Sequence, residues 1–206
     1  ITGKTYDAHD VRQNRNRIPS LIRDFHTAMP AQVSGAGYMF WVFHVIRDYA
    51  RTLEAAGSPW RSEMAAYLKL NAELESAQAP LPIIFGHNDL LPANFIDDGQ
   101  KIWLIDFEYA GFGTAMFDLS GIAANADMLA DDAQAMIEAY FGSLPNADRT
   151  PMLRSFAAMQ CAAVLREALW GMVSSIHLNA PGADYDAYAR ENLSRLDTVL
   201  QNFRKA

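Results

Sequence analysis

The sequence predicts a mainly α-helical fold with one small β-hairpin, an α+β chain that forms a single domain. Apolar residues recur at helical spacing over most of the 206 residues. A turn sequence, Asp97-Asp98-Gly99-Gln100, separates two short apolar runs, and Asp-Gly is favoured where a hairpin turn needs a positive φ. The chain is 50% hydrophobic, which at this length is enough for one sizeable core.

The amino-terminal helices are predicted from two apolar faces. The first lies at 10–29, where Pro19 marks a kink or a restart, Ser20 could cap the restarted helix, and arginines form a solvated outer face. The second is an aromatic stripe that begins at Tyr38 and ends at Gly57. We interpret this stripe as core rather than as a ligand-binding box.

The later helices are predicted from the same spacing and from proline and glycine boundaries. The segment at 150–176 is apolar over a wide arc, which is typical of a central, buried helix. Ser58-Pro59 and Thr150-Pro151 are expected to start two of the helices. The expected ranges are 59–79, 117–125, 131–141, 150–176 and 184–203.

The short strands are predicted around the hairpin turn. Ile83 to Phe85 form an apolar strand that leads into the polar residues after it. Phe95 and Ile96 lead into the turn, and residues 101–105 run back from it. Residues just before and just after the hairpin should therefore meet at one end of a short ribbon.

Those residues form the most informative stretch, which extends from Gly86 to Gly111. Residues 87–94 fit H-x-D-x-x-x-x-N, and an apolar strand then ends at Asp106. The pattern indicates phosphoryl transfer, in which a protein supplies positioning, a base and Mg²⁺ ligands. Asp89 would take the proton of a substrate hydroxyl, while Asn94 and Asp106 would offer the oxygen ligands that Mg²⁺ prefers.

A structural interpretation of the same residues stays open. Asp89 could cap a turn, Asn94 could hold an Asx-turn, and Asp106 could be a solvated strand end. His87, beside an apolar strand, is interpreted as a hydrogen-bonded scaffold residue. Asp118, near the start of a predicted helix, either braces the loop, which we favour, or acts as a ligand.

The motif HNDLLPAN at 87–94 and the motif IDFEYAG at 105–111 together resemble the choline/ethanolamine kinases, within the aminoglycoside-phosphotransferase group of kinase-like enzymes. The sequence FDL at 117–119 is similar to the step that follows the metal-binding segment in that family. The resemblance implies the larger, carboxyl-terminal lobe of a protein-kinase-like fold. It also implies ATP as the phosphoryl donor and Mg²⁺ as the metal.

Downstream aromatic residues extend the resemblance to about residue 190. Trp170 lies in a segment similar to the family's tryptophan-glycine helix, and Tyr188 lies in a D-Y-A-like segment. With Tyr109, they stand where the family surrounds a quaternary ammonium with aromatic faces. Glu108 could contact a second Mg²⁺ or the substrate cation.

These observations leave several functions open. The first is a small-molecule kinase for an amino alcohol, choline or ethanolamine, and the second is an aminoglycoside phosphotransferase or another kinase of the same group. A non-catalytic kinase-like binding domain is the third. A metal-dependent hydrolase that uses His87, Asp89 and Asp106 is a poorer fit, since Asn94 would then have no role.

Composition limits the partners. Lys and Arg number 17 against 24 Asp and Glu, a formal net charge of −7, so a nucleic-acid-binding role is not expected. The only cysteine, Cys161, excludes an intrachain disulfide and is interpreted as a small buried hydrophobe. We find no signal peptide and no apolar run long enough to span a membrane, and we expect a cytoplasmic location.

The opening residues indicate how the chain is organised. Residues 1–4, with Gly3, resemble the exit from the hinge between the two lobes of the family fold. We find neither a glycine-rich phosphate-covering loop nor a V-A-I-K-like strand lysine. We therefore expect residues 1–206 to form the carboxyl-terminal lobe, with the nucleotide-clamping amino-terminal lobe absent from this chain. The oligomeric state is not predicted.

Overall fold

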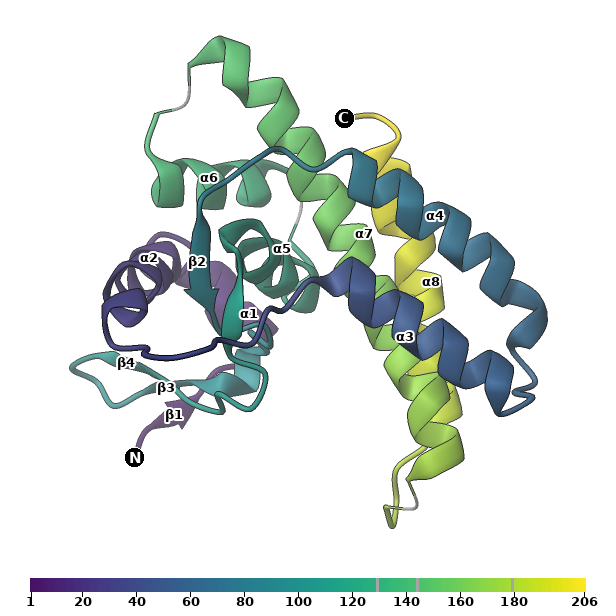
Figure 1. Cartoon of the computed structure of the whole chain (residues 1–206). Helices are drawn as coiled ribbons and strands as arrows, with labels where there is room; N and C mark the ends of the chain where they lie inside the picture. The colour runs from purple at the N-terminus through teal and green to yellow at the C-terminus, as the bar shows by residue number, and fades with distance from the viewer. Residues whose placement is uncertain (129, 144, 179) are drawn as a thin grey trace.

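The computed structural model describes residues 1–128, 130–143, 145–178 and 180–206. Most of these residues are helical, which confirms the predicted mainly α class (Figure 1). The helices are α1 (Ala8–Gln13), α2 (Ile18–Ala28), α3 (Val42–Ala55), α4 (Met64–Ser76), α5 (Ala115–Asn125), α6 (Ala130–Phe141), α7 (Asn146–His177) and α8 (Tyr185–Phe203). Short 3-10 turns lie at Met29–Ala31, Arg61–Glu63 and Pro92–Asn94.

The strands form two small antiparallel sheets. In the first, β3 (Phe95–Asp97) pairs on one side with β4 (Ile102–Leu104) and on the other with β1 (Lys4–Thr5). In the second, β2 (Ile83–Gly86) pairs with β5 (Gly111–Thr114). The predicted hairpin and the strand at 83–85 are thus confirmed, whereas β1 and β5 were not predicted.

The hairpin turn forms for the expected reasons. Asp98 accepts backbone N–H bonds from Gln100 at 2.8 Å and Lys101 at 2.9 Å, while Gly99 takes a φ of 88°. The bond from Lys101, one from the indole N–H of Trp103 at 2.7 Å and the bond from Gln100 stabilise the ionised side chain and hold the pKa of Asp98 down at about 2. The turn therefore fixes the register in which Phe95 faces Leu104.

Helix α7 is the central element, as its wide apolar arc predicts. It packs against α3, α5 and α8, and its inward residues such as Leu165 and Leu169 are fully buried (Figure 1). Cys161 is also buried in α7, which confirms its interpretation as a small hydrophobe, and burial raises the pKa of its thiol to about 12. The helix begins at Asn146, earlier than the expected start at Thr150-Pro151, and Pro151 lies inside it.

The predictions for the segment at 10–29 are confirmed in one respect and wrong in another. The segment at 10–29 contains two helices, which confirms the restart expected at Pro19, but Ser20 is not a cap, because α2 already begins at Ile18. Pro19 fits there since the first turn of a helix does not need its missing N–H.

The aromatic stripe also begins later than predicted. Tyr38 belongs to an extended segment in which its carbonyl accepts from Phe112 N–H at 2.8 Å, and α3 begins only at Val42. Tyr38 is 61% exposed, so its assignment to the core was wrong. The next predicted helix, at 59–79, likewise begins at Met64, after a 3-10 turn.

A close backbone approach at Gly113 supports the placement of this extended segment. A Cβ at Gly113 would lie 2.8 Å from the carbonyl oxygen of Phe40, so Gly113→Ala must displace one of the two backbones. We expect it to lower the free energy of unfolding by about 1–3 kcal/mol. Gly121→Ala, on α5 with no atom within 4 Å of its new Cβ, should instead leave stability unchanged or raise it. Urea unfolding of both variants checks this, and equal effects would contradict it.

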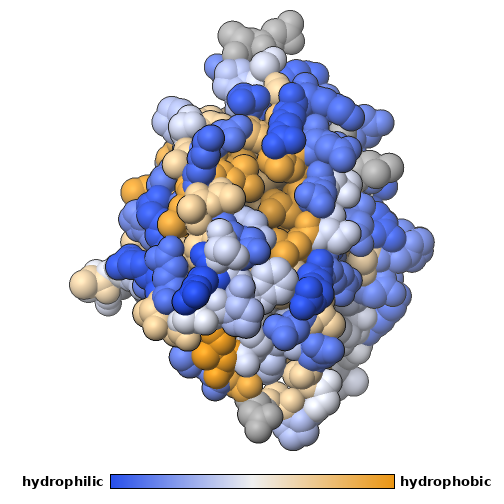
Figure 2. Space-filling view, turned by 90° about the vertical axis from the view of Figure 1, so that its right-hand side faces the viewer, coloured by the Kyte–Doolittle hydropathy of each residue, from blue (hydrophilic) through white to orange (hydrophobic). Residues whose placement is uncertain are grey.

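The surface is mixed in character. On the side where α3, α4 and α8 lie, hydrophobic residues gather in a central area that hydrophilic residues border (Figure 2). Within the parts of the chain that the structure describes, no helix combines the length and the hydropathy needed to cross a membrane.

Candidate active site

The loop after β2 is anchored to the helical core by Asp118. This carboxylate, 2% exposed near the start of α5, accepts the backbone N–H groups of His87 and Asn88, both at 2.7 Å. It also accepts a hydrogen bond from His26 Nε2 of α2 at 2.8 Å. One buried side chain thus joins α2, α5 and the loop. His26 was not singled out in the sequence, where nothing distinguishes it from other helical histidines.

Asn88 connects the same loop to the segment that ends at Gly111. Its φ is 64°, a left-handed conformation that asparagine tolerates better than most residues. Its side-chain Nδ2 donates to the carbonyl oxygen of Tyr109 at 3.0 Å, with longer contacts to Gly86 and Gly111. The loop before the hairpin and the turn after it are therefore held together.

His87 uses both ring nitrogens within this framework. Nε2 donates to the carbonyl oxygen of Ile105 at 2.8 Å, and Nδ1 accepts the N–H of Asp89 at 3.3 Å. The ring is fully buried and packs 4.8 Å from the ring of Phe107. With both nitrogens engaged, His87 has no free nitrogen for a metal, which counts against the hydrolase alternative.

The two candidate metal ligands lie at the same end of the hairpin. Ile105, the residue directly before Asp106, donates its backbone N–H to the carbonyl oxygen of Asn94 at 3.0 Å. Asn94 Nδ2 donates to the carbonyl oxygen of Asp89 at 2.9 Å, which leaves its amide oxygen as the atom able to bind a metal. Asp106 is exposed and has a φ of 65°. An amide oxygen and a carboxylate are hard ligands that fit Mg²⁺.

Asp89 lies against a charged pair on α7. Arg166 Nη1 donates to Asp89 Oδ1 at 3.3 Å, and the same nitrogen donates to Glu167 Oε1. The side chain of Asp89 is 16% exposed and that of Arg166 is 4% exposed. Burial raises the pKa of the Asp89 carboxyl, and the Arg166 charge opposes part of that rise.

Arg166 and Glu167 were not predicted as functional residues. The sequence contains an indication of their role, because this arginine–glutamate pair interrupts a helix that is otherwise apolar on a wide arc. Buried charges are retained where they are paired. Arg166 contacts the proposed base directly, and Glu167 is joined to it only through the Arg166 guanidinium.

The aromatic residues expected to form one cage lie in two groups. The ring of Tyr109 lies under the Arg166 guanidinium at 5.0 Å, whereas Trp170 packs edge-on against Tyr188 at 5.6 Å and Tyr185 at 5.8 Å. The Tyr188 hydroxyl donates to Glu167 Oε2 at 2.7 Å. The Arg166–Glu167 pair therefore links the two groups. Glu108, next to Tyr109, is exposed.

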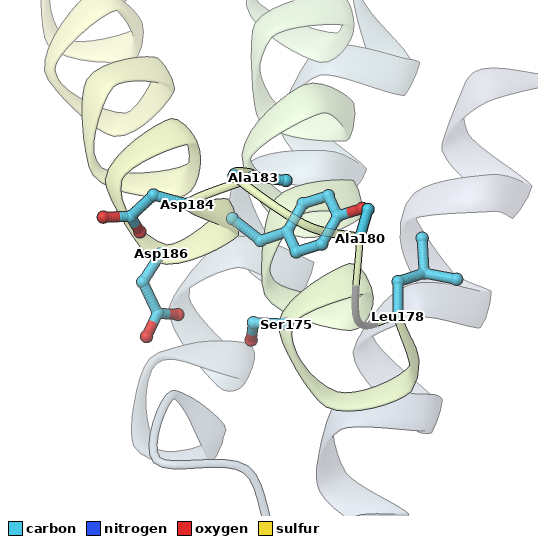
Figure 3. Close-up of a pocket in the computed structure, with 8 residues that line it drawn as sticks. Ser175, Leu178, Ala180, Ala183, Asp184 and Asp186 are labelled. Carbon is cyan, nitrogen blue, oxygen red and sulfur yellow. The ribbon is translucent and has the colours of Figure 1, made fainter.

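Two cavities adjoin these groups. One of about 380 Å³ lies between α3 and Arg166, and its lining includes Tyr38, Asp48, Tyr49 and Tyr109. The other, of about 450 Å³, lies where α7 connects to α8 and is lined by Asp184, Tyr185 and Asp186 (Figure 3). Asp184 also caps α8 by accepting the N–H of Ala187 at 2.8 Å.

Comparison with known proteins places this chain in a family. A model of the family described as choline/ethanolamine kinase matches residues 1–128. Protein LicA of Haemophilus influenzae is 24% identical over 166 residues, which are 79% of this chain and 48% of that protein. The chain thus spans about half the length of this relative.

Solved structures show the same fold. A choline/ethanolamine kinase family protein from Mesorhizobium loti superposes with a TM-score of 0.80 at 24% identity, over 97% of this chain and 68% of that one. An ethanolamine kinase of Plasmodium vivax gives a TM-score of 0.75 at 17% identity, over 100% of this chain and 64% of that one. The fold is therefore the kinase-like fold that the motifs predict. With the family model matching more than half of its residues, the chain belongs to the choline/ethanolamine kinase family.

Proposed function

We propose that this chain carries the base and the metal ligands of an ATP-dependent phosphotransferase whose acceptor is the hydroxyl of a small amino alcohol, choline or ethanolamine. The observation that carries the proposal is the convergence of Asp89, Asn94 and Asp106. Asn94 bonds the backbone of Asp89 at 2.9 Å and that of Ile105 at 3.0 Å, so the three side chains share one end of the hairpin. Membership of the family supports it.

In the proposed reaction the acceptor hydroxyl gives its proton to Asp89 while its oxygen bonds to the γ-phosphorus of ATP. The bond between that phosphorus and the β–γ bridging oxygen breaks, and ADP leaves. Asn94 and Asp106 would hold Mg²⁺, which when bound neutralises charge on the phosphates. Because burial raises the pKa of Asp89, this carboxylate is a stronger base than an exposed aspartate.

The acceptor class is proposed from charge and aromatic content. The chain carries a formal charge of −7, which favours a cationic substrate. Trp170 and Tyr188, linked to Asp89 through Glu167 and Arg166, offer aromatic faces near the base. Aromatic faces bind ammonium groups, quaternary ones included.

Truncation of Trp170 tests the cation site. We expect Trp170→Leu to raise KM for choline about 2- to 30-fold, equivalent to a lost cation–π contact of about 0.5–2 kcal/mol, with a small change in kcat. Steady-state kinetics measures both constants. Trp103→Leu is the control, since that ring stacks on Lys101 at 3.4 Å on the hairpin and should leave KM unchanged. An unchanged KM in Trp170→Leu would place the cation elsewhere.

The acceptor itself is identified by comparing substrates. The full-length protein is incubated with ATP and Mg²⁺ and with choline, ethanolamine or an aminoglycoside in parallel, and ADP release is followed. Selective release with choline or ethanolamine is expected. Release with the aminoglycoside alone would overturn the acceptor class while keeping the mechanism, and no release with any of them would favour a domain that binds without catalysis.

A further inference from the structure

A small cavity lies directly beside the proposed base. It measures about 20 Å³, which is room for about one water-sized group. One wall is the loop that carries Asp89 and Leu90, the second is α5, and the third is the part of α7 that carries Ala163 and Arg166. The cavity is therefore bounded by the segments that surround the base.

The α5 wall of this cavity is one face of the helix. Phe117, Gly121 and Asn125 all line the cavity, and residues four positions apart lie on the same side of an α-helix. Asn125 Nδ2 donates to the carbonyl oxygen of Leu90 at 3.4 Å, which ties the end of α5 to the loop. Gly121 thus lies at the centre of the helix face that is turned toward the loop of Asp89.

Neither the backbone nor the packing requires a glycine at position 121. Gly121 lies inside α5 without a positive φ, and a Cβ added to it would meet no atom within 4 Å beyond its own helix backbone. At Gly171 of α7, by contrast, an added Cβ would lie 3.1 Å from the backbone of Ala189. A glycine in a helix interior costs about 1 kcal/mol relative to alanine. Gly121 therefore weakens α5, and what it provides is space beside the base.

The walls of that space favour an apolar occupant. Arg166 Nη1 already donates to Asp89 at 3.3 Å and to Glu167, and its Nε, which has no partner among the described residues, is closed to solvent. Asp118 already accepts backbone N–H groups of the loop. The apolar part of the lining comes from Leu90, Phe117 and Ala163. A methyl group is similar in size to a water molecule and needs no hydrogen bond.

The reaction proposed above determines which part of an acceptor reaches this space. When the acceptor hydroxyl lies at Asp89, the next atom is the carbon that bears the hydroxyl. A substituent on that carbon is then within reach of the cavity beside the base. Choline and ethanolamine carry only hydrogen atoms at this position and leave the space unused.

We propose that Gly121 is a specificity-determining residue that leaves room for a methyl-sized substituent on the hydroxyl-bearing carbon, and that the acceptors include such branched amino alcohols. The simplest of them is 1-amino-2-propanol. Its secondary hydroxyl gives its proton to Asp89 and its oxygen bonds to the γ-phosphorus of ATP, while the bond from that phosphorus to the β–γ bridging oxygen breaks and ADP leaves. This inference rests on the proposed function for the position of the hydroxyl at Asp89.

Steady-state kinetics of the full-length protein with ATP and Mg²⁺ tests the inference with ethanolamine and the two enantiomers of 1-amino-2-propanol. The wild type should use one enantiomer with a kcat/KM within about 10-fold of that for ethanolamine, because only one enantiomer directs its methyl group into the cavity. Gly121→Ala should lower the kcat/KM of that enantiomer about 10- to 100-fold more than the kcat/KM of ethanolamine, since two methyl groups then compete for one space.

The control variant is Ala72→Val. It enlarges an exposed side chain on α4 and should leave the ratio of the two kcat/KM values unchanged. A wild type that turns over ethanolamine but neither enantiomer would overturn the inference. Equal losses for ethanolamine and the branched acceptor in Gly121→Ala would overturn it as well.

Binding without turnover separates this inference from the proposed function. Saturation-transfer NMR follows the methyl signal of each enantiomer with the full-length protein, Mg²⁺ and a non-hydrolysable ATP analogue, after circular dichroism has shown that each variant is folded. The Kd of one enantiomer should be about 10- to 100-fold higher for Gly121→Ala than for the wild type. This result without turnover of any alcohol would refute the proposed function and leave the room at Gly121 standing. An unchanged Kd, or no binding of either enantiomer, would refute the inference even in an enzyme that phosphorylates ethanolamine.

Discussion

Asp89→Asn is expected to lower kcat by about 10²- to 10⁴-fold, because the amide cannot take the proton of the acceptor hydroxyl. The change is nearly isosteric, and Arg166 keeps Glu167 as a partner, so the fold should be retained. KM for the acceptor should change little, since the role proposed for Asp89 is at the hydroxyl rather than at the cation. Steady-state kinetics with the acceptor that the wild type turns over measures both effects.

The control for this variant is Asp24→Asn. Asp24 is an exposed carboxylate on α2, and its replacement should leave kcat unchanged. Near-normal turnover by folded Asp89→Asn would show that Asp89 is not the base. A loss of turnover in both variants would point to a general effect of charge instead.

Asp118→Ala is expected to cause the largest loss of stability. Its carboxylate accepts from two backbone N–H groups and from His26, and all three donors would be left buried without this partner. Removing one member of such a buried charged network costs about 3–5 kcal/mol of the free energy of unfolding. Since the loop that carries His87 and Asn88 loses its anchor, turnover should fall as well.

Urea unfolding monitored by circular dichroism measures this loss. Asp24→Ala removes an exposed carboxylate from α2 and should change the free energy of unfolding by no more than about 0.5 kcal/mol. A loss below about 1 kcal/mol in Asp118→Ala would mean that the three donors find other partners, and the bracing role of Asp118 would then be wrong.

The hairpin and the end at which its polar residues meet could be predicted from the sequence because their determinants are local. Asp98 and Gly99 specify the turn by themselves, and the pairing of Phe95 with Leu104 follows from it. By contrast, β5 consists of Gly111 to Thr114 and becomes a strand only by pairing with β2. Its sequence has little strand propensity of its own, so only the tertiary partner reveals it.

Candidate site residues could be predicted where they belong to a sequence motif. Residues that reach the site only through the packing of a distant helix could not. Asp89, Asn94 and Asp106 were proposed as site residues from their spacing, and the structure places them at one end of the hairpin. Arg166 and Glu167 reach Asp89 from a helix distant in the sequence, and helical periodicity does not say which face of α7 meets the loop.

The arrangement of the predicted aromatic cage also depends on packing that the sequence does not reveal. The family resemblance implies that Tyr109, Trp170 and Tyr188 form part of a cage around one cation, whereas the structure puts Tyr109 under Arg166 and pairs Trp170 with Tyr188. A residue that already lies under an internal guanidinium is less available to a substrate ammonium. We therefore expect Trp170 and Tyr188 to contribute more to acceptor binding than Tyr109.

Asp89 is proposed to direct transfer of the γ-phosphoryl group of ATP to an alcohol hydroxyl. The most direct measurement is ³¹P NMR of the products formed by the full-length protein with ATP, Mg²⁺ and choline or ethanolamine, beside the Asp89→Asn variant. We expect a phosphate monoester of the alcohol, formed in step with ADP by the wild type and nearly absent with the variant. ADP accompanied only by inorganic phosphate, or equal monoester from both proteins, would contradict it.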